Sequence, residues 1–155
     1  MEETLDKIVA AREAIWFEEP AEITRLPEIK AARDQGASTV LFAATKLATL
    51  ITFLNHMRGV AKGGEADLDT MKAVTEPYLA FHAGVYGNFY QLADTAQVVR
   101  WAQEALAGAA DLEEYAILVG ELAIYLNRVD YWVDLKIPWA AFGDVFEQEL
   151  AEASQ

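Results

Sequence analysis

The chain of 155 residues contains no cysteine. It therefore has no disulfides, cysteine-based zinc sites, iron–sulfur clusters or thiolate nucleophiles. Serine and histidine are also scarce, with Ser38, Ser154, His56 and His82 as the full set. Ser38 and His56 are separated by 18 positions on one predicted helix, or about 27 Å at 1.5 Å per residue. A serine hydrolase dyad is therefore excluded for this pair.

Basic residues are few, since 12 Lys and Arg face 25 Asp and Glu and the formal net charge is −13. Nucleic acids and anionic membranes favour Lys and Arg near phosphate, so we expect no direct contact with nucleic acid or membrane. The acid is concentrated late, with 16 acidic and four basic side chains in residues 65–155. Such charge commonly forms solvated helix faces, and its natural protein partner is basic.

Long hydrophobic runs are missing as well. The longest, 40–54, has about 15 residues including Lys46, whereas a bilayer-spanning helix needs about 20. The first residues are acidic where a signal peptide is basic, and no apolar segment with a small-residue cleavage site follows. These features predict a cytoplasmic protein.

The residues that are present suit a folded helical domain. The hydrophobic fraction is 54%, and the 4 Trp, 6 Tyr and 7 Phe residues can fill a core. Apolar residues recur at helical spacing, and no segment alternates as a strand does. We predict an all-α, single-domain helical bundle over 1–155 with about five to seven helices. Two helices that are apolar on most sides, about 37–61 and 112–135, should be central.

Local signals predict the boundaries of the other elements. The first helix ends near Pro20, and 20–36 forms a connecting arm. Asp67 or Asp69 caps the next helix. Pro77, with the later Gly84 and Gly87, predicts a kink or break before Asn88. A further helix follows over 88–106, and a cap-to-cap turn from Gly108 to Asp111 precedes the second central helix.

A polar, uncharged stripe runs along the helix predicted at 37–61. Its members are Ser38, Thr45, Thr49, Thr52 and His56, whose spacing places them on one face. They are candidate ligand-binding residues for a pocket or wet seam, with His56 as the group that titrates near neutral pH. The alternative, which we favour, is that the stripe is the solvent side of a helix that is otherwise buried.

Glu114, Glu121 and Arg128 are spaced by sevens on the helix predicted at 112–135 and lie nearly in line. A carboxylate at Glu121 among apolar side chains would have a raised pKa unless it were paired, which is how a general acid is made. Arg128 or a partner's cation could instead neutralise it, and we favour this structural interpretation. The candidate catalytic residues are Glu114, Glu121 and His56.

The segment Glu18-Glu19-Pro20-Ala21-Glu22 resembles the E-E-x-x-E motif of all-helical nucleoside triphosphate pyrophosphohydrolases, which hold magnesium with carboxylates. The resemblance implies magnesium-dependent nucleotide hydrolysis. It covers five residues and includes a proline. The E-x-x-D motif that should follow on another helix occurs only upstream, from Glu3 to Asp6.

The leading hypothesis is a non-enzymatic, acidic protein-interaction module that acts as an inhibitor or adaptor on a basic protein surface. We expect a homodimer formed through apolar helix faces. The aromatic residues of the last predicted helix are the candidate interface, namely Trp139, Phe142 and Phe146. No metal or cofactor is expected.

Two alternatives remain open. The first is a helical enzyme that uses the carboxylates, including the magnesium-dependent hydrolysis described above. The second is a carrier for a small ligand, in which Trp16, Trp101, Trp132 and the threonine stripe surround an apolar molecule.

Overall fold

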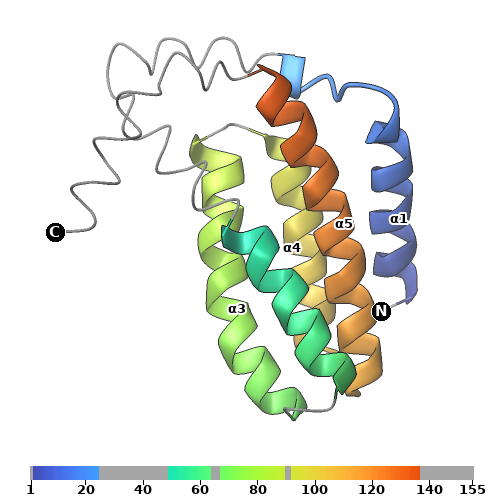
Figure 1. Ribbon diagram of the computed structural model, residues 1–155, viewed down its shortest axis with the longest axis vertical. Helices are drawn as coiled ribbons and strands as arrows, with labels where there is room; N and C mark the ends of the chain where they lie inside the picture. The colour runs from blue at the N-terminus through green and yellow to red at the C-terminus, as the bar shows by residue number, and fades with distance from the viewer. Residues whose placement is uncertain (1, 25–48, 64–66, 90–91, 137–155) are drawn as a thin grey trace, which may run out of the picture.

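A computed structural model describes residues 2–24, 49–63, 67–89 and 92–136, and every regular element in these ranges is helical. These helices confirm the all-α prediction (Figure 1). A helix at 49–63 accompanies four α-helices and one π-helix. Their bounds are Glu2–Trp16 for α1, Leu68–Gly84 for α3, Val85–Phe89 for the π-helix, Ala93–Ala107 for α4 and Leu112–Lys136 for α5.

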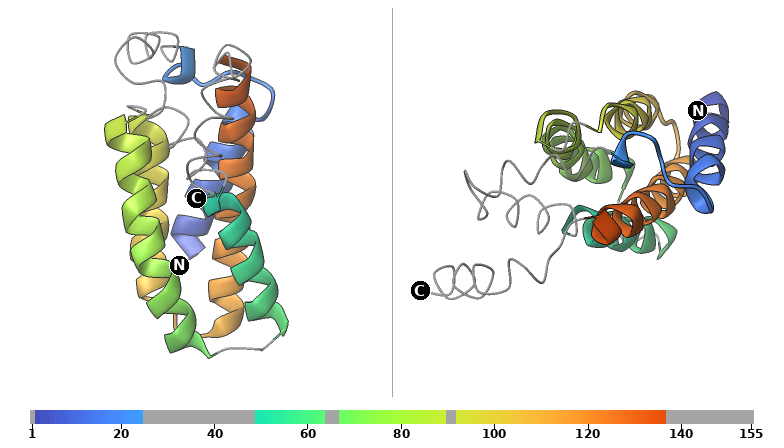
Figure 2. Two further views of the ribbon diagram at one scale, coloured as in Figure 1. Left: turned by 60° about the vertical axis from the view of Figure 1, so that its left-hand side comes forward. Right: turned by 90° about the horizontal axis from the view of Figure 1, so that it is seen from above.

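The helix α5 is central, as its sequence predicts. Seen from above in Figure 2, it lies between the 49–63 helix and α1, while α3 and α4 lie side by side across from it. Its buried side chains occur all along its length and include the fully buried Tyr115, Leu118, Val119, Leu122, Ala123 and Leu126. Because α5 is apolar around much of its circumference, it can contact several neighbours at once.

The described part of the helix predicted at 37–61 is also helical. Leu50 and Leu54 are fully buried on its inner side, whereas Asn55 and His56 are exposed. The other part, 37–48, lies outside the described residues. Gly120 lets this helix approach α5, because a Cβ added there would lie 2.8 Å from Cδ of Arg58.

Two predicted caps are confirmed. The Asp67 side chain accepts a hydrogen bond from the Thr70 amide at 2.7 Å at the start of α3. At the start of α5, Asp111 accepts one from the Glu114 amide at 2.8 Å. Both carboxylates satisfy amide groups that have no partner within the helix, which sets where each helix begins.

Of the predicted kink or break before Asn88, the break does not occur. The helix α3 continues through Pro77 to Gly84, and the π-helix extends the helical segment to Phe89. Pro77 has no amide proton to donate to the carbonyl of Ala73. Both residues are exposed, so water can satisfy that carbonyl. The next helix begins at Ala93 rather than at 88, after the Leu92 amide donates to the Tyr86 carbonyl at 2.8 Å.

The predicted connecting arm begins with a segment that is anchored in the bundle. Ile23 is fully buried, and its amide donates to the Pro20 carbonyl at 3.0 Å. The remainder of the arm, 25–36, is outside the described ranges. In the part of the chain that is described, none of the helices combines the length and apolar character that crossing a membrane requires.

Candidate functional site on the seam between α1 and α5

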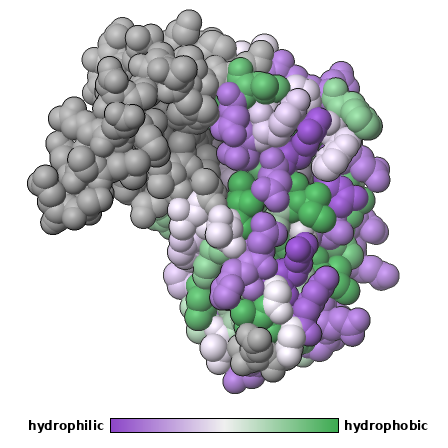
Figure 3. All heavy atoms as spheres, in the orientation of Figure 1, coloured by the Kyte–Doolittle hydropathy of each residue, from purple (hydrophilic) through white to green (hydrophobic). Residues whose placement is uncertain are grey.

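Charged and apolar side chains meet along the line where α1 packs on α5, which we call the α1–α5 seam. Figure 3 shows apolar patches between hydrophilic side chains on the face of the molecule that contains both helices. Two open grooves lie on this seam. The seam comprises Glu2, Leu5, Arg12, Glu13 and Trp16 of α1 and Glu114, Ile117, Leu118, Glu121, Ile124 and Arg128 of α5.

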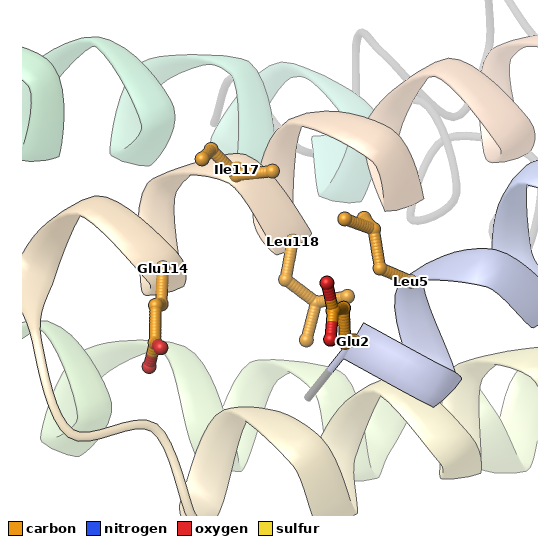
Figure 4. Close-up of a pocket in the computed structure, with 5 residues that line it drawn as sticks. All are labelled: Glu2, Leu5, Glu114, Ile117 and Leu118. Atoms are coloured by element: carbon orange, nitrogen blue, oxygen red, sulfur yellow. The ribbon is translucent and has the colours of Figure 1, made fainter.

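The larger groove, the Glu114 groove, has a volume of about 520 Å³ and is lined by Glu2, Leu5, Glu114, Ile117 and Leu118. In Figure 4 the side chains of Glu2, Leu5 and Leu118 gather where the two helices meet, and Glu114 lies further along α5. Ile117 is 44% exposed and gives this groove an apolar wall that a ligand can reach. Two carboxylates beside an apolar floor suit an organic cation with an apolar body.

An ion pair lies further along the seam. Nη1 of Arg12 donates to Oε2 of Glu121 at 2.5 Å, and the two side chains are 23% and 26% exposed. The predicted partner, Arg128, is seven residues from Glu121, or about 10.5 Å along the helix axis. A cation from another helix therefore neutralises Glu121.

The smaller groove, the Arg12 groove, has a volume of about 270 Å³ and is lined by Arg12, Glu13, Trp16 and Ile124. Arg12 and Glu13 carry opposite charges at successive positions of α1, so the groove offers a cation and an anion beside an indole ring. Glu13 is exposed and has no ion pair or hydrogen bond to another described residue. Its carboxylate is therefore available to a ligand.

Arg128 holds the end of α1 against α5. Its guanidinium lies over the rings of Trp16, Tyr131 and Trp132, with centroid distances of 4.9, 4.2 and 5.2 Å. It also donates to the carbonyl of Trp16, and the Trp132 indole donates to the carbonyl of Ile15 at 2.7 Å. These donors satisfy carbonyl groups in the last turn of α1. Trp16 is thereby held as a wall of the Arg12 groove.

A second polar cluster lies away from the seam and is structural. Both oxygens of Glu22 accept hydrogen bonds at the start of α4, from the amides of Asp94 and Thr95 and from the Thr95 hydroxyl. The Tyr125 hydroxyl contacts that of Thr95, and burial raises the pKa of Tyr125 to about 12. Glu22 thus caps a helix that has no cap of its own at Leu92.

This cluster also bears on the E-E-x-x-E segment. The helix α1 ends at Trp16, so Glu18 and Glu22 do not share a helix as that motif requires. Glu22 uses its oxygens on α4. Within the described ranges, no group of three or more His, Asp or Glu side chains is arranged to hold a metal ion.

Another aromatic stack joins α3 to the 49–63 helix. Tyr78 stacks on Phe53 at 4.2 Å and on His82 at 4.9 Å between ring centroids. His82 is buried, and its Nδ1 lies 2.8 Å from the carbonyl of Tyr78 one turn earlier. This local bond and the stacking are sufficient to explain a buried histidine.

The structure brings together part of the predicted site. Glu114 and Glu121 both lie on the α1–α5 seam, whereas His56, Thr49 and Thr52 lie on an exposed face of the 49–63 helix. Thr45 and the predicted interface residues Trp139, Phe142 and Phe146 are outside the described residues. Sequence analysis did not identify Arg12 or Glu13 as site residues. A signal was present, because Arg12 falls within the apolar stripe of its helix and a cation there calls for an acidic partner.

Comparison with known proteins gives two matches for this fold. The family model of the cucumopine synthase C-terminal helical bundle domain matches residues 1–135. The structure described as McbB in complex with tryptophan has 25% sequence identity and a TM-score of 0.75, and the match covers 92% of this chain and 48% of that chain. A comparison with curated proteins finds no match. This chain thus spans about half the length of McbB, and it belongs to the family of the cucumopine synthase C-terminal helical bundle domain.

Proposed function

We propose that this domain is the helical component of a protein that binds an amino acid with an apolar side chain, and that the ligand lies on the α1–α5 seam. The McbB structure that it resembles contains tryptophan, and the likeness extends over nearly the whole of this chain. Membership of this family supports a role alongside another domain, because the matched domain is the C-terminal one of cucumopine synthase.

The observation that carries the proposal is the meeting of carboxylates and exposed apolar side chains in grooves of small-molecule size. The larger groove is lined by Glu2 and Glu114 together with apolar side chains, and the smaller one by Arg12 and Glu13 together with Trp16 and Ile124. Carboxylates attract an ammonium group, and apolar side chains favour a hydrophobic body over a polar one. The same carboxylates repel a ligand with a second acid, which gives the seam a preference among amino acids.

Calorimetric titration of the full chain with tryptophan, phenylalanine and glutamate tests this function. We expect both apolar amino acids to bind at least tenfold more tightly than glutamate, at low ionic strength. Added salt should weaken binding, because exposed charges are screened. If neither tryptophan nor phenylalanine gives a binding heat at millimolar concentration, the proposal is contradicted.

A non-enzymatic interaction module is the second candidate, favoured by apolar side chains at one end of the seam. Phe17 is 89% exposed and Leu135 is 60% exposed, and Trp16 and Tyr131 are also exposed there. Contiguous exposed apolar surface is typical of interaction sites. This candidate keeps the homodimer, the basic protein partner and the cytoplasmic location that the sequence predicts.

Sedimentation equilibrium tests the homodimer part of this candidate. Phe17→Ser and Leu135→Ser should each weaken self-association, whereas Phe81→Ser should leave it unchanged. Phe81 is a matched control because it is 52% exposed but lies on α3, away from the seam. A wild-type chain that remains monomeric at all concentrations would rule out the dimer.

A further inference from the structure

We infer that Arg12 and Glu13 together bind the α-carboxylate and the α-ammonium of one amino acid, whose side chain lies between Trp16 and Ile124. The inference rests on the proposed function, because it places the amino acid on the α1–α5 seam. It adds the subsite, the two charged contacts and the requirement that the ligand be a zwitterion.

The helix geometry of α1 makes Trp16 a surface neighbour of both Arg12 and Glu13, while the two charged residues themselves point about 100° apart. Trp16 follows Arg12 by four residues and Glu13 by three, which are the spacings of neighbours on a helix surface. All three line the Arg12 groove. An amino acid carries its two opposite charges on substituents of a single carbon, and the two opposite charges that line this groove offer one partner for each.

Arg12 is held in position by Glu121 and still has donors to offer. Glu121 engages Nη1, whereas a guanidinium has five N–H groups in a planar fork. The Arg12 side chain is 23% exposed, so solvent and ligands can reach it. An Arg that is already oriented by an ion pair loses less rotamer freedom when it binds a carboxylate.

Trp16 and Ile124 supply the apolar walls. Arg128 lies over the Trp16 ring at 4.9 Å and holds the indole, while Ile124 faces the groove from α5. The groove volume of about 270 Å³ suits a single amino acid rather than a peptide. The groove therefore selects for an apolar or aromatic side chain.

The two grooves differ in what they should bind. Among the described residues that line the Glu114 groove there are two carboxylates and no cation. It therefore favours an amine without a carboxylate. The Arg12 groove contains both charges and favours the complete amino acid, so ligands that lack one charge distinguish the two grooves.

The test is a calorimetric titration of the full chain with three probes. Tryptophan carries both charges, tryptamine carries only the ammonium and indole-3-propionate carries only the carboxylate. We expect wild type to bind tryptophan about 2- to 5-fold more tightly than tryptamine, the range of one exposed charged contact. Indole-3-propionate should bind most weakly, because the protein carries a net charge of −13.

Single substitutions assign each charge to its residue. Glu13→Gln should weaken the binding of tryptophan and of tryptamine about 2- to 5-fold. The binding of indole-3-propionate should be unchanged or tighter. Arg12→Lys should weaken tryptophan and indole-3-propionate but not tryptamine, and its positive charge still faces Glu121, which protects the fold. Glu104→Gln on α4 is the control for loss of one negative charge, and it should bind all three probes as wild type does.

The outcomes separate the inference from the function on which it rests. If tryptophan binds wild type and both variants equally, the subsite is overturned but amino-acid binding stands. If wild type binds tryptamine as tightly as tryptophan, and only Glu114→Gln weakens the binding of both, the ligand occupies the larger groove and the inference again fails. If none of the probes binds wild type, the proposed function and the subsite fail together.

Discussion

At the scale of single residues, the Arg12–Glu121 contact bears both on the packing of α1 against α5 and on the proposed subsite. The pair joins residues 109 positions apart and ties α1 to α5. It is also the element that orients Arg12 toward the smaller groove. Because both side chains are about one quarter exposed, solvent screens the attraction and the pair contributes modestly to stability.

Glu121→Gln should therefore lower the free energy of unfolding by about 0.5–1 kcal/mol, the range of a partly solvated ion pair. Urea denaturation at pH 7 measures this loss. Glu76→Gln is the control, because Glu76 is exposed in the middle of α3, away from the helix ends, and has no ion pair to another described residue. A loss in Glu121→Gln no larger than in Glu76→Gln would show that the pair adds nothing to stability.

At the scale of elements, helix ends are satisfied by two different means. Asp67 and Asp111 cap α3 and α5 from the adjoining sequence. The helix α4 instead receives its cap from Glu22, more than 70 residues earlier in the chain. This long-range cap attaches the segment after α1 to the start of α4.

Glu22→Ala should lower the free energy of unfolding by about 2–3 kcal/mol, because buried amide groups of α4 lose their acceptor. Glu22→Gln should lose less, since one oxygen remains. Urea denaturation gives the total, and hydrogen exchange should show faster exchange at the Asp94 and Thr95 amides. Glu18→Ala is the matched control on an exposed residue, and equal stability of the two alanine variants would refute the capping role.

At the scale of the whole molecule, negative charge opposes compaction. The net charge is −13, and the acidic side chains on the surface of α5 repel one another. Asp130 is the clearest case, because burial and the neighbouring charge of Asp134 raise its pKa from 3.8 to about 6. The folded state therefore binds a proton on Asp130 in a pH range where the unfolded chain has released it.

The contribution of Asp130 to stability should consequently fall as pH rises from about 4 to about 6, since across that window its carboxyl holds a proton in the folded state that it has lost in the unfolded state. We expect Asp130 to account for about 1–2 kcal/mol of this loss, allowing for solvent around a partly buried group. Asp130→Asn should be more stable than wild type at pH 7 and should lose less stability between pH 4 and pH 6. Urea denaturation at both pH values checks this, and a less stable Asp130→Asn protein at pH 7 would contradict it.

Local patterns along the chain were sufficient to predict the helical class, the central position of α5 and the caps of α3 and α5. Each depends on residues within one or two helical turns, as with Asp67 and Thr70. The same local patterns overestimated the effect of Pro77 on α3. That effect depends on whether the carbonyl that loses its hydrogen bond faces solvent, and the packing of α3 decides this. Local patterns also placed Glu114 and Glu121 on one face correctly, since both lie on one helix.

The sequence by itself determined where helices form and which faces are apolar, because propensity, periodicity and capping act between near neighbours. Only the tertiary structure decided that Arg12 meets Glu121, that Glu22 caps α4 and that two grooves open on the α1–α5 seam. Those contacts join residues 70 to more than 100 positions apart. Helices that are apolar on similar faces can pack in several orders, so pairing depends on how all the faces are buried together.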